Sequence, residues 1–154
     1  MEDIGDPEVH LTNDAIQQGS PDYGRYEPAN KLNYAELQRY LDTLPRRRDQ
    51  HFNFHAQIYP KLKEIAAATV RATYPFLRER GPGDNFELFG LDFMVDQHFK
   101  PWLIEVNTNP SLEVNCPVLE RVIPGVLEHA LRLGVDAVFP PPSQYSATHK
   151  YHIP

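Results

Sequence analysis

Residues 86–112 read FELFGLDFMVDQHFKPWLIEVNTNPSL, and this stretch decides the fold. Its apolar residues fall into two runs, 86–96 and 100–107, which are separated by a polar turn around residues 96–98. Two apolar runs joined by a short polar turn are typical of a β-hairpin. We therefore expect two antiparallel strands here, with the rest of the chain arranged around them.

Acidic and amide side chains are placed regularly along this predicted hairpin. Side chains alternate between the two faces of a strand, so Asp92 points away from the side of its apolar neighbours. Glu105 and Asn107 lie two positions apart on the second strand and share one face. The same alternation assigns the neighbouring residues of the second strand: Leu103 with Glu105, and Trp102, Ile104 and Val106 on the opposite face.

If the first strand pairs Asp92 near Glu105 and Asn107, three oxygen ligands converge. Carboxylate and amide oxygens, together with phosphate oxygens, are the ligands that Mg²⁺ prefers. Acidic residues on a strand are also common on a solvated face. Glu105, however, has only apolar neighbours in Trp102–Val106, and a carboxylate in such surroundings is costly unless it is paired or bound to metal. We therefore expect a metal site on this hairpin, and we expect Trp102 in the core.

The flanking segments predict helices on both sides of the hairpin. Asn33 is a good N-cap for a helix that Pro45 ends, with Glu36 at its third position. Apolar residues recur every three or four positions over 53–80 and over 117–134, which indicates two further helices. Pro60 and Pro75 leave the ends of the first of these uncertain. The sequence therefore predicts an α+β fold with an antiparallel hairpin between helices.

The two ends of the chain carry weaker patterns. Residues 9–17 alternate roughly between apolar and polar and are expected to begin as a short strand. Residues 19–30 are rich in Gly, Pro, Asp and Asn and are expected to form a loop. Residues 142–154 are expected to form a disordered tail. Cys116 is expected to be a small buried residue.

Composition excludes several classes of protein. A length of 154 residues suits one domain. The net charge of −6 argues against a broad nucleic-acid surface. The single cysteine, Cys116, excludes an internal disulfide. No apolar run approaches the roughly 20 residues that a membrane helix needs. We expect a cytoplasmic protein, or part of one, with neither nucleic acid nor membrane as a partner.

Two separated motifs resemble one known family. The stretches 89–93 (FGLDF) and 102–112 (WLIEVNTNPSL) closely resemble the metal-binding hairpin of the tubulin–tyrosine-ligase-like enzymes, which belong to the ATP-grasp superfamily. The stretch 10–13 (HLTN) resembles a second signature of that family, and 23–27 (YGRYE) with Asn30 is similar to it as well. The resemblance covers residues 8–141, in the same order as in the family.

The resemblance implies a fold, an activity and a set of site residues. The fold would be the carboxy-terminal ATP-grasp subdomain. Asp92, Glu105 and Asn107 match the family's magnesium ligands, and Thr12 and Asn13 match residues that lie against ATP. In this family ATP phosphorylates a carboxylate of a protein, and the amine of a free amino acid then attacks the acyl phosphate.

Partners also follow from the resemblance. The acceptor would be tubulin or microtubules, in the cytoplasm at the cytoskeleton or in a cilium. Tyrosine, glutamate and glycine are all added within the family. The stretch 10–17 is somewhat more similar to the tyrosine-adding type, but the other two amino acids stay open.

The upstream part of such a ligase has no counterpart here, because only nine residues precede His10. That part would carry the phosphate-holding lysines and the adenine-binding hinge. We therefore expect the chain to be a fragment that supplies the Mg-ATP wall of a ligase and is inactive in isolation. The alternative is a truncated, catalytically silent relative that binds microtubules or another partner.

Overall fold

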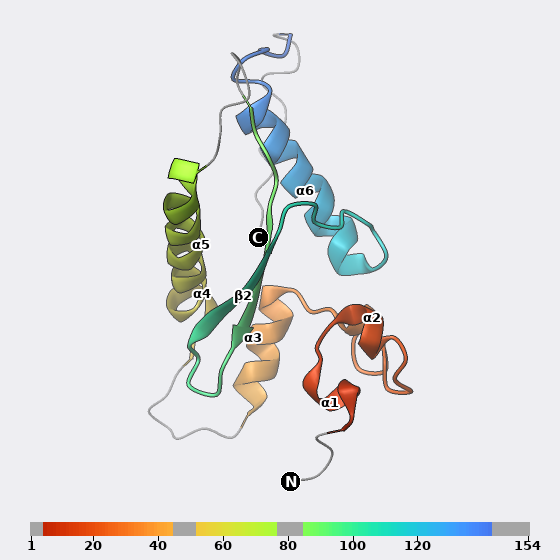
Figure 1. The fold of residues 1–154 in the computed structure, drawn as a ribbon. Coiled ribbons are helices and arrows are strands. Elements are labelled where there is room, and N and C mark those ends of the chain that lie inside the picture. Colours follow the sequence, from red (N-terminus) through yellow and green to blue (C-terminus); the bar gives the residue numbers. More distant parts are fainter. Residues whose placement is uncertain (1–4, 45–51, 77–84, 143–154) are drawn as a thin grey trace.

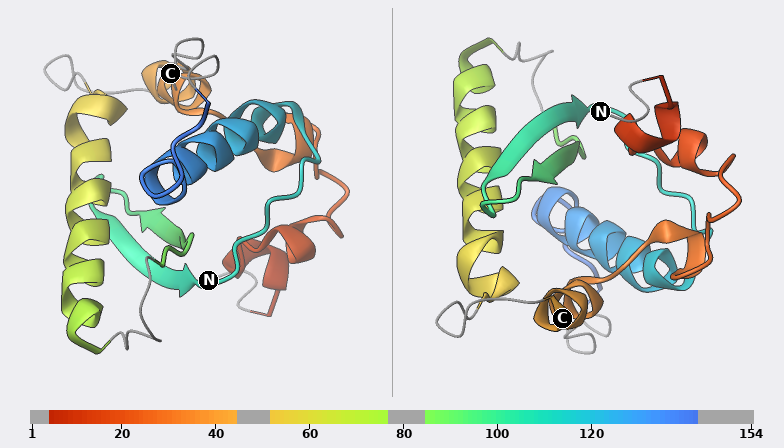
Figure 2. Two further views of the ribbon diagram at one scale, coloured as in Figure 1. Left: turned by 90° about the horizontal axis from the view of Figure 1, so that it is seen from above. Right: turned by 90° about the horizontal axis from the view of Figure 1, so that it is seen from below.

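The computed structural model describes residues 5–44, 52–76 and 85–142. A two-stranded antiparallel sheet of β1 (Gly90–Val95) and β2 (Pro101–Asn107) lies between helices (Figure 1). Helix α5 (Tyr59–Thr73) runs along one side and contacts β2. Helix α6 (Pro117–Gly134) lies across the hairpin from α5 in Figure 1, and the views of Figure 2 show α6 running beside the sheet. The expectation of mixed helix and sheet with one antiparallel hairpin is confirmed for the described residues.

The amino-terminal strand is a wrong prediction. The structure has two short helices instead, α1 (Pro7–His10) and α2 (Asp14–Gln17). The Asp6 side chain accepts a hydrogen bond from the Glu8 amide at 2.9 Å, and Pro7 occupies the first helical position. A capping aspartate followed by proline is a strong signal for a helix start. This local chemistry outweighs an irregular alternation of only three apolar residues.

Asp14 is hydrogen-bonded to two side chains of the segment that follows α2. Its Oδ1 accepts hydrogen bonds from the Tyr23 hydroxyl at 2.9 Å and the Lys31 ammonium at 3.1 Å. The Lys31 hydrogen bond is the main reason why the pKa of the Asp14 carboxyl lies below its usual range. The expected loop over 19–30 is confirmed, with a single 3-10 turn, η1 (Pro28–Asn30). The Asn30 side chain accepts a hydrogen bond from the Gly24 amide at 2.7 Å.

Helix α3 (Tyr34–Thr43) begins where its cap predicts. The Asn33 side chain accepts from the Glu36 amide, and the Glu36 carboxylate accepts from the Asn33 amide, both at 2.9 Å. This reciprocal pair satisfies two amides that the first turn leaves unbonded. Leu44 takes an extended conformation directly before Pro45, as a residue preceding proline prefers.

The single long helix predicted over 53–80 is divided in the structure. It comprises α4 (Phe54–Gln57), α5 and a 3-10 turn, η2 (Tyr74–Phe76). Pro60 lacks the amide hydrogen that a continuous helix needs, and it lies instead in the first turn of α5. Pro75 lies in the 3-10 turn. Residues 77–80 fall outside the described ranges.

The hairpin is shorter than predicted on its first strand, which begins at Gly90 and not at Phe86. Asn107 is the last residue of β2 and the chain then bends away, so no partner strand is available to residues 86–89. Phe86 packs instead near the end of α6: a Cβ atom built on Gly134 would lie 2.6 Å from the Phe86 ring.

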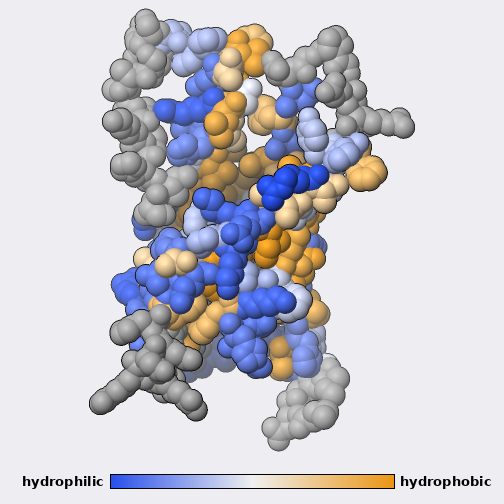
Figure 3. Space-filling model, turned by 90° about the vertical axis from the view of Figure 1, so that its left-hand side faces the viewer, coloured by the Kyte–Doolittle hydropathy of each residue, from blue (hydrophilic) through white to orange (hydrophobic). Residues whose placement is uncertain are grey.

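Helix α6 has the predicted bounds, Pro117–Gly134, and Cys116 is buried as expected, with 6% of its surface exposed. Of the tail predicted over 142–154, residues 143–154 lie outside the described ranges. The described core is small: the buried residues are Phe54, Ile58, Pro101 and Cys116. On the side of α5, apolar atoms reach the surface between hydrophilic ones (Figure 3).

Candidate metal-binding site on the hairpin

Strand register brings the two predicted carboxylates together. Asp92 on β1 pairs with Glu105 on β2, and Gly90 pairs with Asn107. Directly opposed residues in an antiparallel pair have Cα atoms roughly 4.5–5.5 Å apart and side chains on the same face. Asp92, Glu105 and Asn107 therefore gather on one face, as the alternation predicts.

A β-bulge at Ile104 changes the faces beyond Glu105. One step along β1, from Asp92 to Phe93, corresponds to two steps along β2, from Glu105 to Leu103. Leu103 therefore shares a face with Phe93, and Trp102 pairs with Met94 on the face of Asp92. The faces predicted for Leu103 and Trp102 are wrong, because a bulge inserts an unpaired residue and reverses the alternation behind it.

The two faces of the hairpin differ in composition. One face then carries mainly apolar side chains that are half-buried or buried: Leu91, Phe93, Leu103 and Pro101. The other face carries Asp92, Glu105, Asn107, Met94 and Trp102. Trp102 is 49% exposed, so its predicted place in the core is wrong.

Glu105 is also exposed, which corrects the expectation that its apolar neighbours bury it. Ile104 and Val106 are 59% and 40% exposed and provide no apolar enclosure. Asp92 is exposed and Asn107 is half-buried. The argument from desolvation therefore falls, and the register alone supports a shared site at this place.

The turn after β2 folds back over the start of β1. A Cβ atom built on Gly90 would lie 2.9 Å from Cβ of Pro110 and 3.6 Å from Cβ of Asn107. Pro110 thus occupies the space that a side chain at position 90 would need. This contact fixes the end of the segment 107–110, which begins with one of the three predicted ligands.

Asp96 lies at the opposite end of the hairpin, where it is hydrogen-bonded to Trp102 and to the turn. Its Oδ2 accepts a hydrogen bond from Nε1 of Trp102 at 2.9 Å, and its Oδ1 accepts from the amides of His98 and Lys100 at 2.8 and 3.0 Å. The Lys100 ammonium lies 3.7 Å from the centroid of the Trp102 ring, a cation–π contact. These bonds, above all the one from Trp102, hold the pKa of the Asp96 carboxyl below its usual range.

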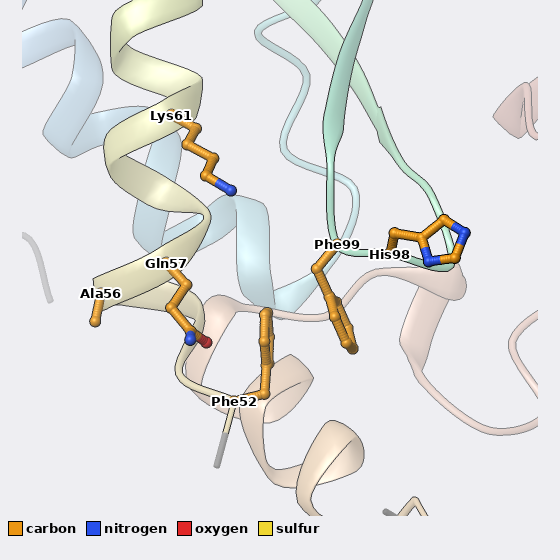
Figure 4. A pocket seen from close by; sticks show the side chains of 6 residues that line it. All are labelled: Phe52, Ala56, Gln57, Lys61, His98 and Phe99. Carbon is orange, nitrogen blue, oxygen red and sulfur yellow. The ribbon is translucent and has the colours of Figure 1, made fainter. Parts of the chain in front are cut away.

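A separate hollow of about 330 Å³ lies between the hairpin turn and the start of α5, lined by Phe52, Ala56, Gln57, Lys61, His98 and Phe99 (Figure 4). The rings of Phe52 and Phe99 stack with centroids 4.0 Å apart, and they join the hairpin turn to the segment before α4. None of its lining residues is a carboxylate. This hollow therefore does not belong to the Asp92–Glu105 face.

Thr12 and Asn13 lie in the connection between α1 and α2, and both are exposed. The Asn13 carbonyl accepts the first hydrogen bonds of α2, from the amides of Ile16 and Gln17 at 3.0 Å. The α1–α2 segment lies on the side of the hairpin away from α5 (Figures 1 and 2). Within the described ranges, no recorded hydrogen bond joins Thr12 or Asn13 to the hairpin trio.

A sequence model of the tubulin-tyrosine ligase family matches residues 1–146 of this chain. The matched region contains the whole hairpin and both motifs on which the resemblance depends. The chain belongs to the tubulin-tyrosine ligase family. The family expected from the residues 10–13 and 89–112 is therefore confirmed.

Three relatives show which members of the tubulin-tyrosine ligase family this chain is similar to. Protein polyglycylase TTLL10 of Rattus norvegicus is 33% identical over 132 residues, covering 82% of this chain and 19% of the relative. Tubulin glycylase 3B of Tetrahymena thermophila is 28% identical over 136 residues, covering 88% and 11%. Inactive polyglycylase TTLL10 of Homo sapiens is 36% identical over 129 residues, covering 82% and 19%. The chain thus spans a fifth or less of these relatives' length.

Sequence reasoning missed two features of the site, the Ile104 bulge and the contact between Gly90 and Pro110. The bulge has no signal of its own in a run of apolar residues. A glycine inside an apolar strand, by contrast, is a known sign of close approach by another backbone or side chain.

Among the described residues, no helix has the length and apolar character to cross a membrane.

Proposed function

We propose that this chain supplies the metal-binding wall of an ATP-dependent ligase that joins an amino acid to a carboxylate of tubulin. The observation that carries the proposal is the register of the hairpin, which sets Asp92 opposite Glu105 with Asn107 beside them. Membership of the tubulin-tyrosine ligase family supports the same activity.

The donor set fits Mg²⁺. Two carboxylates and one amide oxygen on an exposed strand face offer the hard oxygen ligands that this ion prefers, and they leave positions for water and phosphate oxygens. Within the described ranges no group of three or more His, Cys, Asp or Glu is placed to hold a metal. The Asn107 amide therefore completes the proposed set, and bound Mg²⁺ would neutralise charge on the transferring phosphoryl group.

The proposed reaction has two steps. An acceptor carboxylate oxygen attacks the γ-phosphorus of ATP, which forms an acyl phosphate and releases ADP. The amine of the free amino acid then attacks the acyl carbon, the new amide bond forms, and phosphate and a proton leave. Asp92, Glu105 and Asn107 would hold Mg²⁺, which would in turn bind the phosphate oxygens, and Thr12 and Asn13 would lie against the nucleotide.

Glycine is the amino acid that we propose. Each of the three relatives described above is named a glycylase or polyglycylase, and one is named for tubulin. This proposal departs from the tyrosine-adding likeness of residues 10–17. Since the chain spans 11–19% of these relatives, we propose that it works within a longer polypeptide.

A second candidate is a catalytically silent relative that binds microtubules or another partner. The human relative at 36% identity is named an inactive polyglycylase, so loss of activity occurs among similar chains. The paired Asp92 and Glu105 favour the active reading, because a silent binding module has no need of them.

The test is incorporation of labelled glycine, glutamate or tyrosine into tubulin by the longest natural protein that carries this sequence. We expect incorporation of glycine that requires ATP and stops when EDTA removes divalent cations. Incorporation of glutamate or tyrosine alone would refute the choice of glycine. Microtubule binding without incorporation of any of the three would favour the silent relative.

A further inference from the structure

Gly90 and Pro110 meet at the end of the proposed metal site. Gly90 is the first residue of β1 and pairs with Asn107, the last residue of β2. Three residues after Asn107, Pro110 folds back so closely that a Cβ atom at position 90 would lie 2.9 Å from Pro110 Cβ. Separations under about 3 Å between such carbon atoms are well inside van der Waals contact, which lies near 3.5–4.0 Å.

Backbone conformation does not explain the glycine. Among the described glycines only Gly24 has a φ in the left-handed region, so alanine could adopt the backbone of position 90. Alanine or a β-branched residue would also stabilise a strand better than glycine does. The reason for glycine is therefore steric, and the group that needs the space is Pro110.

Pro110 cannot yield easily. Its Cβ belongs to a ring that is bonded to the backbone, so it has no rotamer that moves it away. A methyl group at position 90 would push on the backbone of the segment 107–110. The Asn107 Cβ itself lies 3.6 Å away, an ordinary contact, so the disturbance would reach Asn107 through Pro110.

We propose that Gly90 is a positioning residue, and that its contact with Pro110 holds the Asn107 amide beside Asp92 and Glu105. The inference rests on the proposed metal site and adds to it the residue pair that fixes its third ligand. The Asn107 side-chain oxygen can then bind the metal ion, and the turn does not first have to become ordered. Groups that orient a metal ligand typically affect metal affinity by about 10–100-fold when they are changed.

The experiment measures Mn²⁺ binding to the full chain by electron paramagnetic resonance of the free ion. The variants are Gly90→Ala, Pro110→Gly and the double change, with Glu105→Gln as the ligand variant. Gly19→Ala is the matched control, since a Cβ there meets only the Ile16 carbonyl at 3.4 Å. The side-chain amide resonances of Asn107 are followed by NMR in the same variants without metal.

We expect Gly90→Ala to weaken Mn²⁺ binding about tenfold or more and to shift the Asn107 amide resonances, while Gly19→Ala does neither. Pro110→Gly removes the atoms that clash. In the Pro110→Gly background, Gly90→Ala should therefore cause no further loss of Mn²⁺ affinity. Such non-additive effects are expected when the two residues are in direct contact.

Two results would overturn the inference. One is a Gly90→Ala variant that leaves both Mn²⁺ binding and the Asn107 resonances unchanged. The other is a loss of Mn²⁺ affinity on Gly90→Ala that is equally large with Pro110 and with glycine at position 110. If Glu105→Gln and the unaltered chain do not differ in Mn²⁺ binding, the proposed metal site fails, and the Asn107 resonances alone then decide whether the positioning contact exists.

Discussion

At the scale of single residues, Asp96 holds the turn end of the hairpin. It accepts hydrogen bonds from the Trp102 indole and from two turn amides, and Phe99 in that turn has a φ of 59°, in the left-handed region. Non-glycine residues seldom adopt this conformation without support from their surroundings. The bonds to Asp96 provide that support and set the register on which the opposed Asp92 and Glu105 depend.

Acid should therefore loosen the hairpin turn. The Trp102 hydrogen bond, first among its causes, lowers the pKa of Asp96 from its ordinary value of 3.8. The folded pKa is below the unfolded one, so the stabilisation is complete above the ordinary value and is lost as pH falls through the folded pKa. Trp102 is the single tryptophan, so its emission during an acid titration reports this step.

Asp96→Asn is the control for the acid titration, because asparagine has no proton to gain in this range. The transition in Trp102 emission should lie below pH 3.8 in the unaltered chain and be absent from the variant. A midpoint at or above the ordinary value for aspartate would show that the hydrogen bonds to Asp96 do not stabilise the turn.

The grouping of Asp92, Glu105 and Asn107 was predictable from the sequence, whereas the place of Trp102 was not. All three residues lie on the same side of the bulge, so simple alternation assigns them to the correct face. Trp102 lies beyond Ile104, where the count is reversed. Nothing in the run Trp102–Val106 marks which residue is left unpaired, since each apolar member fits a strand.

At the scale of elements, the end of α6 is attached to the segment before β1 through Phe86 and Gly134. We expect Gly134→Ala to destabilise the chain, because a Cβ there would lie 2.6 Å from two atoms of the Phe86 ring. Overpacking costs about 1–3 kcal/mol, while replacing a helical glycine by alanine contributes about 1 kcal/mol in the other direction. The melting temperature should fall by up to several degrees.

The same change in a Phe86→Ala background provides the control. With the ring absent only the helix preference acts, so Gly134→Ala should raise the melting temperature there. A rise in both backgrounds would contradict the contact between Phe86 and Gly134.

Helices whose periodicity and caps agree could be predicted from the sequence, whereas segments whose residues favour two different structures could not. The bounds of α6 and the start of α3 follow from periodicity and from the Asn33–Glu36 capping box. The alternation over residues 9–17 predicts a strand, whereas the Asp6 cap and Pro7 predict a helix start, and the structure has the helix. Pro60 marks the division between α4 and α5, but the sequence alone does not tell whether a proline bends a helix or restarts it.

At the scale of the whole molecule, the described residues enclose little apolar surface. Large apolar side chains are widely exposed on α6 and after it, including Leu133 at 81% and Phe139 at 72%. Soluble monomers seldom leave extended apolar surface uncovered. We therefore expect the purified chain to bind a hydrophobic dye strongly, to bind Mg-ATP weakly and to ligate nothing.

Dye fluorescence, nucleotide titration and labelled amino-acid incorporation into tubulin test this expectation. The longest natural protein that carries the sequence serves as the comparison. Ligation by the isolated 154-residue chain would contradict it, and would show that these residues alone hold both ATP and the acceptor.

The central claim is that Glu105 acts through its charge at a metal site, and one measurement tests it most directly. It is the rate of amino-acid ligation to tubulin by Glu105→Gln in the longest natural protein, with Glu64→Gln on the exposed side of α5 as the matched control. Glutamine keeps the volume of the side chain and removes the charge that would balance the metal. We predict that the rate falls about a thousandfold or more, on the order of 4 kcal/mol or more, with an unchanged melting temperature, and that Glu64→Gln has a normal rate. A near-normal rate for Glu105→Gln would remove Glu105 from the metal site and contradict the account.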